Sequence, residues 1–363
     1  MEHKSKLGIV TDDAFGLMHD PPYSKPSFIS FENPSRISHV ITYLKKQKIF
    51  ENGQVIRLEP LDINESVLNL AHSRYHIDSI KRISSLGGGL LEDEVFVTEN
   101  TFKIAKKAVG GAIQAILSII SGEVNQSFAL IRPPGHHALR EKASGLCIFN
   151  NIANAIYYVR EYMNYQEKIA IIDIDDHFGD GLARYFYEDP NVLYFSIHEY
   201  DFEMGDVGLM DELGASEGLG KNINFPVPPG IVNQDFLKLF DVVKPILQEF
   251  RPSMIIVATG FDMYFADPIG NCQLTSIAYH QFAKNLLKLS EDICDGKLAF
   301  ILEGGYSIIG LKYCVLAIIN ALLDEPYNPP EFENISFPNV VSKEVDKIRN
   351  TLIKLLAPYW RNL

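Results

Sequence analysis

The sequence predicts an α/β protein in which one parallel β-sheet is covered by helices on both faces. Short apolar runs rich in β-branched residues recur along the chain and alternate with longer stretches of helical periodicity. Strands that are apolar along their whole length are typical of a parallel sheet that is buried on both faces. No repeat, low-complexity tract or long Gly/Ser/Pro linker divides the 363 residues, so we expect a single domain.

The expected elements follow from these patterns in chain order. Strands are predicted at residues 7–10, 54–58, 127–131, 169–174, 192–197, 254–258 and 298–302. Helices are predicted at 35–43, 101–120, 148–162, 234–249, 276–294 and 308–323, and Asn33 followed by Pro34 marks the start of the first of them. The tail, residues 324–363, is expected to hold one further helix near 345–356.

The composition is typical of a globular protein with a large core and an acidic surface. Hydrophobic residues make up 47% and charged residues 22%, and 33 basic against 46 acidic side chains give a net charge of −13. This balance argues against a nucleic-acid partner and tolerates cationic substrates. Without a signal-peptide pattern or a membrane-spanning apolar run, we expect a cytoplasmic protein with no membrane partner. The four cysteines lack CxxC spacing, which suits a reducing compartment and excludes a thiolate zinc knuckle.

Polar or glycine-rich segments follow four of the predicted strands. These segments are residues 132–137, 175–181, 260–267 and 303–306. Ligands of open α/β sheets bind at the carboxyl ends of the strands, where such segments meet. The sequence therefore predicts one functional site built from His, Asp and Tyr side chains of all four segments.

A metal centre is the first component of this site. Asp173, Asp175 and His177 are spaced at i, i+2 and i+4, so that on a strand they share one face. Carboxylates and imidazole suit zinc or iron(II), and a catalytic zinc has three protein ligands and one open position. Asp175 and His177 supply two ligands, and Asp267 is the candidate third. Two alternatives are a solvated polar cap on the sheet edge and a phosphatase with an Asp nucleophile, although the chain has no matching lysine-and-threonine phosphate cradle.

Acid–base and oxyanion groups are the second component. His136 and His137 follow a buried strand, where each imidazole needs a hydrogen-bond partner, and Asp173 and Asp180 can orient them. One such histidine can take a proton from water and later pass it to a departing amine. Tyr306 follows paired glycines and can donate to a developing oxyanion. The alternatives are exposed loop histidines and a plain turn with the tyrosine in the core.

Taken in order, these motifs resemble the histone deacetylase superfamily, which includes acetylpolyamine amidohydrolases and bacterial acetoin-utilisation proteins. The similar segments are 33–36, 72–73, 132–138, 144–151, 173–181, 195–198, 224–230, 260–275 and 302–306, so the resemblance covers about residues 7–323. Residues 267–273 look closer to the class II pattern than to class I.

The resemblance implies an eight-stranded parallel sheet flanked by helices, in a single deacetylase domain spanning 1–363. It also implies zinc-dependent hydrolysis of N-acyl amides of lysine side chains, with acetylpolyamines or other small acylated amines as the alternative substrates. A catalytically silent binding module is the third hypothesis, disfavoured by the intact set of motifs.

The resemblance also assigns roles to residues. The zinc ligands would be Asp175, His177 and Asp267, with iron(II) or cobalt as exchangeable metals. His137, partnered by Asp180, would be the principal general base and acid; His136, partnered by Asp173, would act mainly through its charge, and Tyr306 would polarise the acyl carbonyl. A structural potassium ion would be held by the main chain of Asp173, Asp175, His177 and Ile197 and by the Ser196 hydroxyl.

The substrate channel is where this chain departs from the family. Gly145 should line it near the catalytic centre, Leu146 replaces the usual phenylalanine of one wall, and Phe202 is the expected opposite wall. Leu274 stands where polyamine-selective relatives often carry an acidic gate residue, which favours acyl-lysine. Two further positions complete the comparison: Phe178 replaces a second histidine that is not a metal ligand, and Arg36 is expected near an inner cavity.

Overall fold

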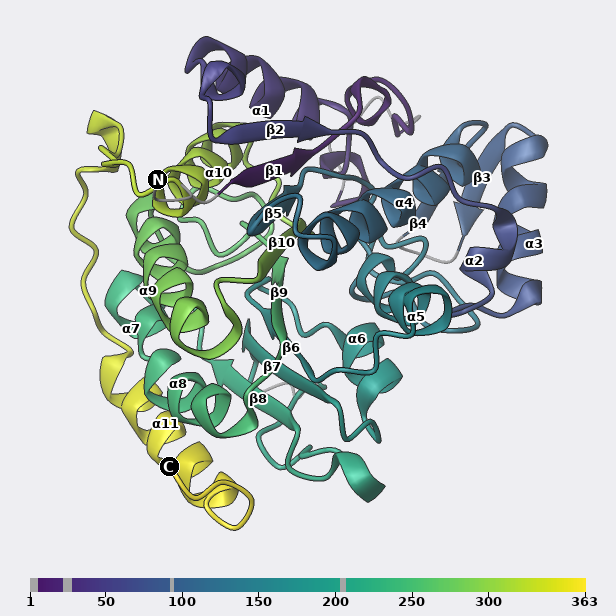
Figure 1. The fold of residues 1–363 in the computed structure, drawn as a ribbon. Coiled ribbons are helices and arrows are strands. Elements are labelled where there is room, and N and C mark those ends of the chain that lie inside the picture. The colour runs from purple at the N-terminus through teal and green to yellow at the C-terminus, as the bar shows by residue number, and fades with distance from the viewer. Residues whose placement is uncertain (1–5, 22–27, 92–94, 203–206) are drawn as a thin grey trace.

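The computed structural model describes residues 6–21, 28–91, 95–202 and 207–363 (Figure 1). At its centre lies a parallel sheet of eight strands in the order β2-β1-β5-β10-β9-β6-β7-β8, which confirms the predicted fold class. The three strands β10, β9 and β6 are buried along their whole length, as their apolar sequences predict. The strands are β1 (Leu7–Val10), β2 (Val55–Leu58), β5 (Gln126–Ala129), β6 (Ile169–Asp173), β7 (Val192–Glu199), β8 (Asn222–Val227), β9 (Met254–Thr259) and β10 (Leu298–Leu302).

Helices cover both faces of this sheet. Figure 1 shows α1 (Ser35–Lys46), α9 (Ser276–Cys294) and α10 (Ile308–Leu322) on one side, and α4 (Thr101–Ile120) and α5 (Asn151–Met163) on the other. The bounds of α4 and α9 agree with the prediction residue for residue. The helix predicted at 234–249 is divided into α7 (Asn233–Leu237) and α8 (Phe240–Phe250).

Some elements were not predicted, and their sequences show why. Strand β8 contains Pro226 and two asparagines; it lies at the sheet edge and pairs only with β7, a position that tolerates proline. The other unpredicted elements are short or amphipathic: α2 (Glu65–Leu68), α3 (Arg74–Ser85), α6 (Asp180–Phe186) and the antiparallel pair β3 (Gly88–Leu91) and β4 (Val95–Thr98).

The C-terminal tail packs on the same core. The expected helix is present as α11 (Ser342–Leu356), and its apolar side chains Val345, Leu352 and Leu356 are fully buried. Beyond it, Trp360 donates a hydrogen bond from Nε1 to the carbonyl oxygen of Gly220 at 2.9 Å. The tail therefore contributes to the stability of the sheet edge at β8.

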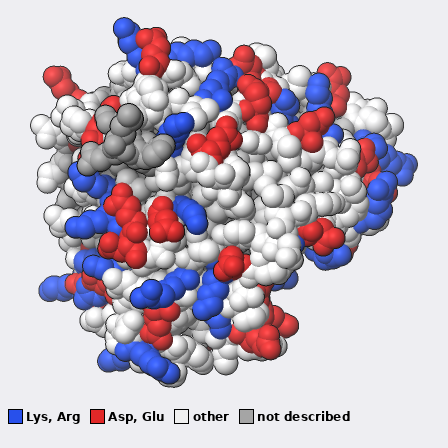
Figure 2. Space-filling view, viewed as in Figure 1, with Lys and Arg blue, Asp and Glu red and all other residues white. Residues whose placement is uncertain are grey.

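The surface and the cysteines agree with the composition. Acidic and basic side chains are interspersed over the face shown in Figure 2, with no broad basic patch on that face. All four cysteines are buried free thiols. Within the described residues, every helix is too short or too polar to cross a bilayer.

Candidate active site

The four segments singled out in the sequence meet at one edge of the sheet. They follow β5, β10, β9 and β6, which are consecutive in the sheet order, and parallel strands present their carboxyl ends at the same edge. The candidate site therefore consists of loops that start side by side, although they are far apart in the chain.

Three ligand atoms converge where β6 and β9 end. His177 Nδ1 lies 3.3 Å from Asp175 Oδ1 and 3.3 Å from Asp262 Oδ2. Two bonds of about 2.0–2.1 Å at a tetrahedral angle separate their ligand atoms by roughly 3.3 Å, so the spacing fits one zinc ion. Asp175 and Asp262 are at most 1% exposed, whereas the side chain of His177 is 42% exposed. The group thus combines two buried carboxylates with an imidazole that faces solvent.

Asp262, and not Asp267, is the third member of this group, which corrects the prediction. The Oδ2 atom of Asp267 accepts hydrogen bonds from the backbone N–H groups of Tyr306 at 2.7 Å and Ser307 at 2.8 Å. Asp262 comes three residues after β9, close to the strand end, in the same way that Asp175 comes two residues after β6. The chain turns between the two aspartates, and Asp267 consequently caps the loop that holds Tyr306.

Each of the tandem histidines has the carboxylate partner that was predicted. His136 Nδ1 lies 3.2 Å from Asp173 Oδ2, and His137 Nδ1 lies 2.9 Å from Asp180 Oδ1. Asp173 is itself held by the hydroxyl of Tyr194, which donates to Oδ2 at 3.0 Å. The two imidazole rings are 4.0 Å apart between centroids, so the charge of one acts directly on the other.

The surroundings shift the pKa values of the two histidines in opposite directions. Burial lowers the pKa of His136, but the carboxylates of Asp175 and Asp173 outweigh it and raise this pKa to about 10. Burial lowers the pKa of His137, and the positive charge of His136 lowers it further against the opposing effect of Asp180. At neutral pH His136 is therefore cationic and His137 neutral. His137 donates its Nδ1–H to Asp180, so Nε2 is unprotonated and can accept a proton.

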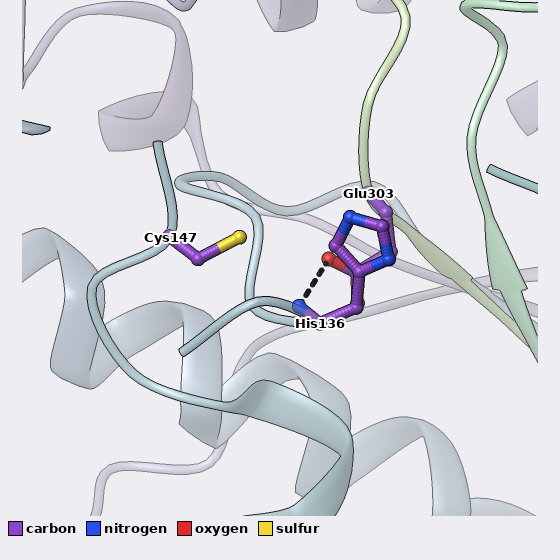
Figure 3. Close-up of side chains that lie close together, drawn as sticks. All are labelled: His136, Cys147 and Glu303. Carbon is purple, nitrogen blue, oxygen red and sulfur yellow. Dashed lines mark hydrogen bonds between the residues drawn. The ribbon is translucent and has the colours of Figure 1, made fainter. Parts of the chain in front are cut away.

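Glu303, the residue after β10, fixes the tandem-histidine loop and was missed by the sequence prediction. Its Oε2 accepts the backbone N–H groups of Gly135 at 2.6 Å and His136 at 3.0 Å (Figure 3). The thiol of Cys147 points toward the same place from the opposite side. Burial raises the pKa of Glu303 to about 7. A polar residue directly after a buried strand was the signal that could have identified it.

Arg36 fixes the backbone next to Tyr306 and contacts the Tyr306 ring. The guanidinium donates to the carbonyl oxygens of Gly305 at 2.7 Å and Glu303 at 2.6 Å, and its carbon lies 4.8 Å from the centre of the Tyr306 ring. The Tyr306 hydroxyl makes no hydrogen bond to any part of the chain that the structure describes. Burial raises the pKa of this phenol well above its usual value, so it stays protonated and able to donate.

Gly145 and Leu146 form a turn against His137. Both have positive φ angles, +51° and +66°, and the flanking Ser144 and Cys147 are joined by two backbone hydrogen bonds. A Cβ atom on Gly145 would lie 2.4 Å from the His137 ring, so only glycine allows this approach. Leu146 is 3% exposed, which shows that neighbouring side chains cover it.

Leu274 does not face a channel, which corrects the prediction of a gate position. It is 0% exposed, and its backbone pairs with Met263 and Phe265, so its side chain belongs to the core. Phe202, in contrast, is 44% exposed and packs at a tilted angle against the ring of Tyr200, with ring centroids 4.7 Å apart. Its position opposite Leu146 stays a prediction.

The residues expected around potassium lie at the end of β6, in the loop that follows it, and on the neighbouring part of β7. The register of the two strands places Asp173 opposite Ser196. The Ser196 hydroxyl lies 2.8 Å from His198 Nδ1, and Phe178 packs on the His198 ring at 5.0 Å. Phe178 therefore fills space beside this strand pair, without entering the group of Asp175, His177 and Asp262.

The chain is similar to known deacetylases over most of its length. Residues 30–322 match the family model described as histone deacetylase domain. A probable deacetylase of Archaeoglobus fulgidus is 34% identical over 318 residues, which are 87% of this chain and 86% of that protein. The polyamine deacetylase HDAC10 of Danio rerio is 36% identical over 72% of this chain and 40% of its own length, so it is much the longer protein. Histone deacetylase HDA1 of Candida albicans is 33% identical over 83% of this chain and 36% of its own length. The solved HDA15 HD domain superimposes with a TM-score of 0.85 and 27% identity, over 99% of this chain and 96% of that one.

Proposed function

Because the chain belongs to the histone deacetylase family, we propose that it is a zinc-dependent amidohydrolase that removes acyl groups from lysine side chains. One arrangement carries the proposal. The group of Asp175, His177 and Asp262 lies beside the His137–Asp180 pair, and Tyr306 is held on the adjacent strand end. These are the parts that hydrolysis of an unactivated amide requires.

The donor set fits zinc because the buried carboxylates need a cation. Burial and the charge of Asp175 raise the pKa of Asp262, as expected for two carboxylates in one small space. When bound by Asp175, His177 and Asp262, zinc supplies an acidified water molecule and polarises the acyl carbonyl. Iron(II) or cobalt suits the same oxygen- and nitrogen-containing set.

Proton transfer is assigned to His137. Its neutral imidazole can take a proton from the attacking water through Nε2, and the Asp180 carboxylate stabilises the imidazolium that results. The same proton can then pass to the amine nitrogen as the amide bond breaks. His136, already cationic, contributes positive charge beside the developing oxyanion and does not exchange its proton at neutral pH.

Tyr306 supplies a hydrogen-bond donor to the oxyanion, in addition to the positive charge of His136. Its hydroxyl is protonated and without a partner in the described residues, and its backbone is fixed by Asp267. A donor fixed in advance stabilises the transition state without reorganisation. We also propose that Asp173, Asp175, His177, Ser196 and Ile197 hold a structural potassium ion at the ends of β6 and β7.

Acyl-lysine is the proposed substrate class, and acylpolyamines are the alternative. With Leu274 buried, the preference rests on the loop that carries Asp267. There, Ile269 donates its N–H to Asp267 Oδ1 at 3.0 Å and is partly exposed, so an apolar residue and not a charged one stands in the loop whose Asp267 holds the backbone of Tyr306. The alternative is supported by the relatives named polyamine deacetylases and by the acidic net charge.

A competition experiment separates these substrates. An acetyl-lysine peptide and acetylspermidine are offered together to the zinc-loaded protein, and released acetate and both products are quantified. We expect the peptide to be the preferred substrate, and a strong chelator to stop both reactions until zinc is restored. Preference for acetylspermidine would replace the substrate assignment, and unchanged turnover in the chelator would contradict the metal mechanism.

The acidic limb of the pH–rate profile should report on His137. Activity requires neutral His137, so it falls when the pH drops below the pKa of this residue. Asp180→Asn removes the carboxylate that raises this pKa, and the limb should move to lower pH by roughly one unit, because a charge-assisted hydrogen bond is worth about 1.5 kcal/mol. The measurement is kcat/KM against pH, with Asp189→Asn as a control remote from the site. A limb that moves upward or stays in place would assign it to another group.

The side chain at position 146 should tune the preference for acyl length. Leu146 is covered in the structure, so a phenylalanine there must displace its neighbours or narrow the channel beside His137. Leu146→Phe should favour acetyl over longer acyl groups by about fivefold, the equivalent of roughly 1 kcal/mol of apolar contact. Acetyl-, butyryl- and longer acyl-lysine peptides are compared on the wild type, Leu146→Phe and the volume-conserving Leu146→Met. An equal ratio in all three proteins would show that residue 146 does not line the channel.

A further inference from the structure

A second cluster of metal-ligating side chains lies next to the candidate active site. Asp176 follows β6, Glu199 is the last residue of β7, and Cys272 belongs to the loop after β9. One oxygen or sulfur atom from each lies within 4.8 Å of the others. The backbone joins two of them directly, because Glu199 N–H donates to the carbonyl oxygen of Asp176 at 2.8 Å. The three ligand atoms therefore lie close together, although they come from the end of β7 and from the loops after β6 and β9.

Two members of the cluster are buried, and Glu199 is partly exposed at its edge. Asp176 is 3% exposed and Cys272 is 2% exposed, and the Cys272 sulfur lies 3.3 Å from Asp176 Oδ1 and 3.8 Å from Glu199 Oε2. Gly270 closes it from the loop side: a Cβ atom there would lie 2.7 Å from Asp176 Oδ2. The space beside this carboxylate is consequently limited to a small group or a single ion.

The carboxylate of Asp176 has the Cys272 thiol as its one hydrogen-bond donor in the described residues. Other carboxylates near the site have N–H donors: Asp267 accepts backbone N–H groups through both of its oxygens, and Glu303 accepts two through Oε2, while its Oε1 has no partner in the described residues. Glu199 accepts the backbone and side-chain N–H groups of Asn271 at 3.2 and 2.8 Å. An enclosed carboxylate without N–H donors is unfavourable unless it is protonated or paired with a cation.

We propose that Asp176, Glu199 and Cys272 bind a second divalent cation, chemically zinc-like and distinct from the ion held by Asp175, His177 and Asp262. Two carboxylate oxygens and one sulfur form a donor set that zinc and cobalt accept and that magnesium and calcium, which take oxygen ligands, do not favour. Cys272 loses its proton on binding, so the site gains the negative charge that holds the cation.

The cation would fasten the loop that supports catalysis. Cys272 and Gly270 belong to the same loop as Asp267, whose carboxylate holds the backbone of Tyr306. The backbone N–H of Asp176 also donates to Asp262 Oδ1 at 2.9 Å. An ion joining this loop to the end of β7 thus stabilises two parts of the active site from outside, and its role is positioning and not catalysis.

Cobalt substitution tests the site, because of the two proposed divalent-cation sites only the one at Asp176, Glu199 and Cys272 contains sulfur; Cys147, which lies near His136 and Glu303, is the other thiol to be controlled for. The 363-residue protein is stripped of metal and titrated with Co²⁺ alone while its near-ultraviolet spectrum is recorded. We expect two cobalt ions per chain and a thiolate-to-cobalt charge-transfer band. Cys272→Ser should abolish the band, and Asp176→Asn should lower the bound metal from two ions to one. Cys147→Ser, the buried thiol nearest the tandem histidines, is the matched control and should retain the band.

Three results would overturn the proposal. They are a wild-type protein that binds one cobalt ion without a sulfur band, a band that disappears in Cys147→Ser and persists in Cys272→Ser, and two ions bound without any sulfur band. The cobalt titration of the wild-type protein gives both the number of bound ions and the presence of the band, and so decides the first and third results. The test therefore does not depend on the variants folding. It also needs no measurement of activity, and failure of this site leaves the proposed deacylase function untouched.

Discussion

Asp262→Asn should lower the bound metal by one ion per chain and reduce kcat/KM by at least about 100-fold. The expectation follows from the position of Asp262 Oδ2, 3.3 Å from His177 Nδ1 in the group that includes Asp175. Loss of a residue that only supports a metal ligand lowers affinity or activity roughly 10- to 100-fold, and loss of a ligand itself should exceed that. Elemental analysis after gel filtration and steady-state kinetics measure the two effects.

Asp267→Asn is the matched control, since it changes the same functional group five positions along the loop. Asp267 accepts the backbone N–H groups of Tyr306 and Ser307 through Oδ2 and that of Ile269 through Oδ1, and asparagine keeps only one of these two acceptor oxygens, so the loop loses part of its support. We expect this variant to retain its metal and to lose activity through misplacement of Tyr306. Loss of an ion in Asp267→Asn and its retention in Asp262→Asn would identify Asp267 as the metal ligand, as the sequence predicts.

The confusion of these two aspartates shows where sequence reasoning stops. The four strand ends could be predicted from apolar runs followed by polar residues, and their convergence followed from the rule for parallel sheets. Within the segment 260–267, however, both aspartates follow the same strand. Only the path of the backbone turn decides that Asp262 faces His177 while Asp267 turns to Tyr306. That path depends on long-range contacts such as the bridge between Tyr264 and Leu274.

The burial of Leu274 and the charges of the tandem histidines likewise could not be predicted from the sequence. Leu274 was placed in the channel by the family resemblance, but its backbone pairs with residues 263 and 265, and its side chain enters the core. The pairings of His136 with Asp173 and of His137 with Asp180 could be anticipated from the resemblance. The opposite pKa shifts of these histidines could not, because they depend on which ring lies near Asp175.

Most of the fold was accessible from the sequence because its strands are buried on both faces. β6, β9 and β10 read as continuous apolar runs, and α4 and α9 have clear amphipathic periodicity. Strand β8 departs from this pattern, since Asn222, Asn224 and Pro226 are unusual in a strand interior. Its position at the sheet edge and the side-chain hydrogen bonds of the asparagines explain why it forms nevertheless.

Tyr306→Phe should lower kcat by roughly 100- to 1,000-fold while leaving KM and metal content close to those of the wild type. An oxyanion donor contributes about 2.7–4 kcal/mol to the transition state and little to the ground state. The substitution removes only the hydroxyl. The backbone of residue 306 remains held by Asp267, and a phenyl ring can keep the contact with the Arg36 guanidinium at 4.8 Å. Any loss of rate therefore reports the missing donor and not a collapsed loop.

The kinetic pattern distinguishes this role from a structural one. A lost transition-state donor lowers kcat and kcat/KM together, whereas a displaced loop would raise KM and lower thermal stability. Tyr313→Phe on α10 is the control, because that ring packs against Tyr43 away from the candidate site. It should leave both constants unchanged. If Tyr306→Phe turns over at the rate of the wild type, the phenol is not the donor, and the positive charge of His136 must stabilise the oxyanion together with the metal.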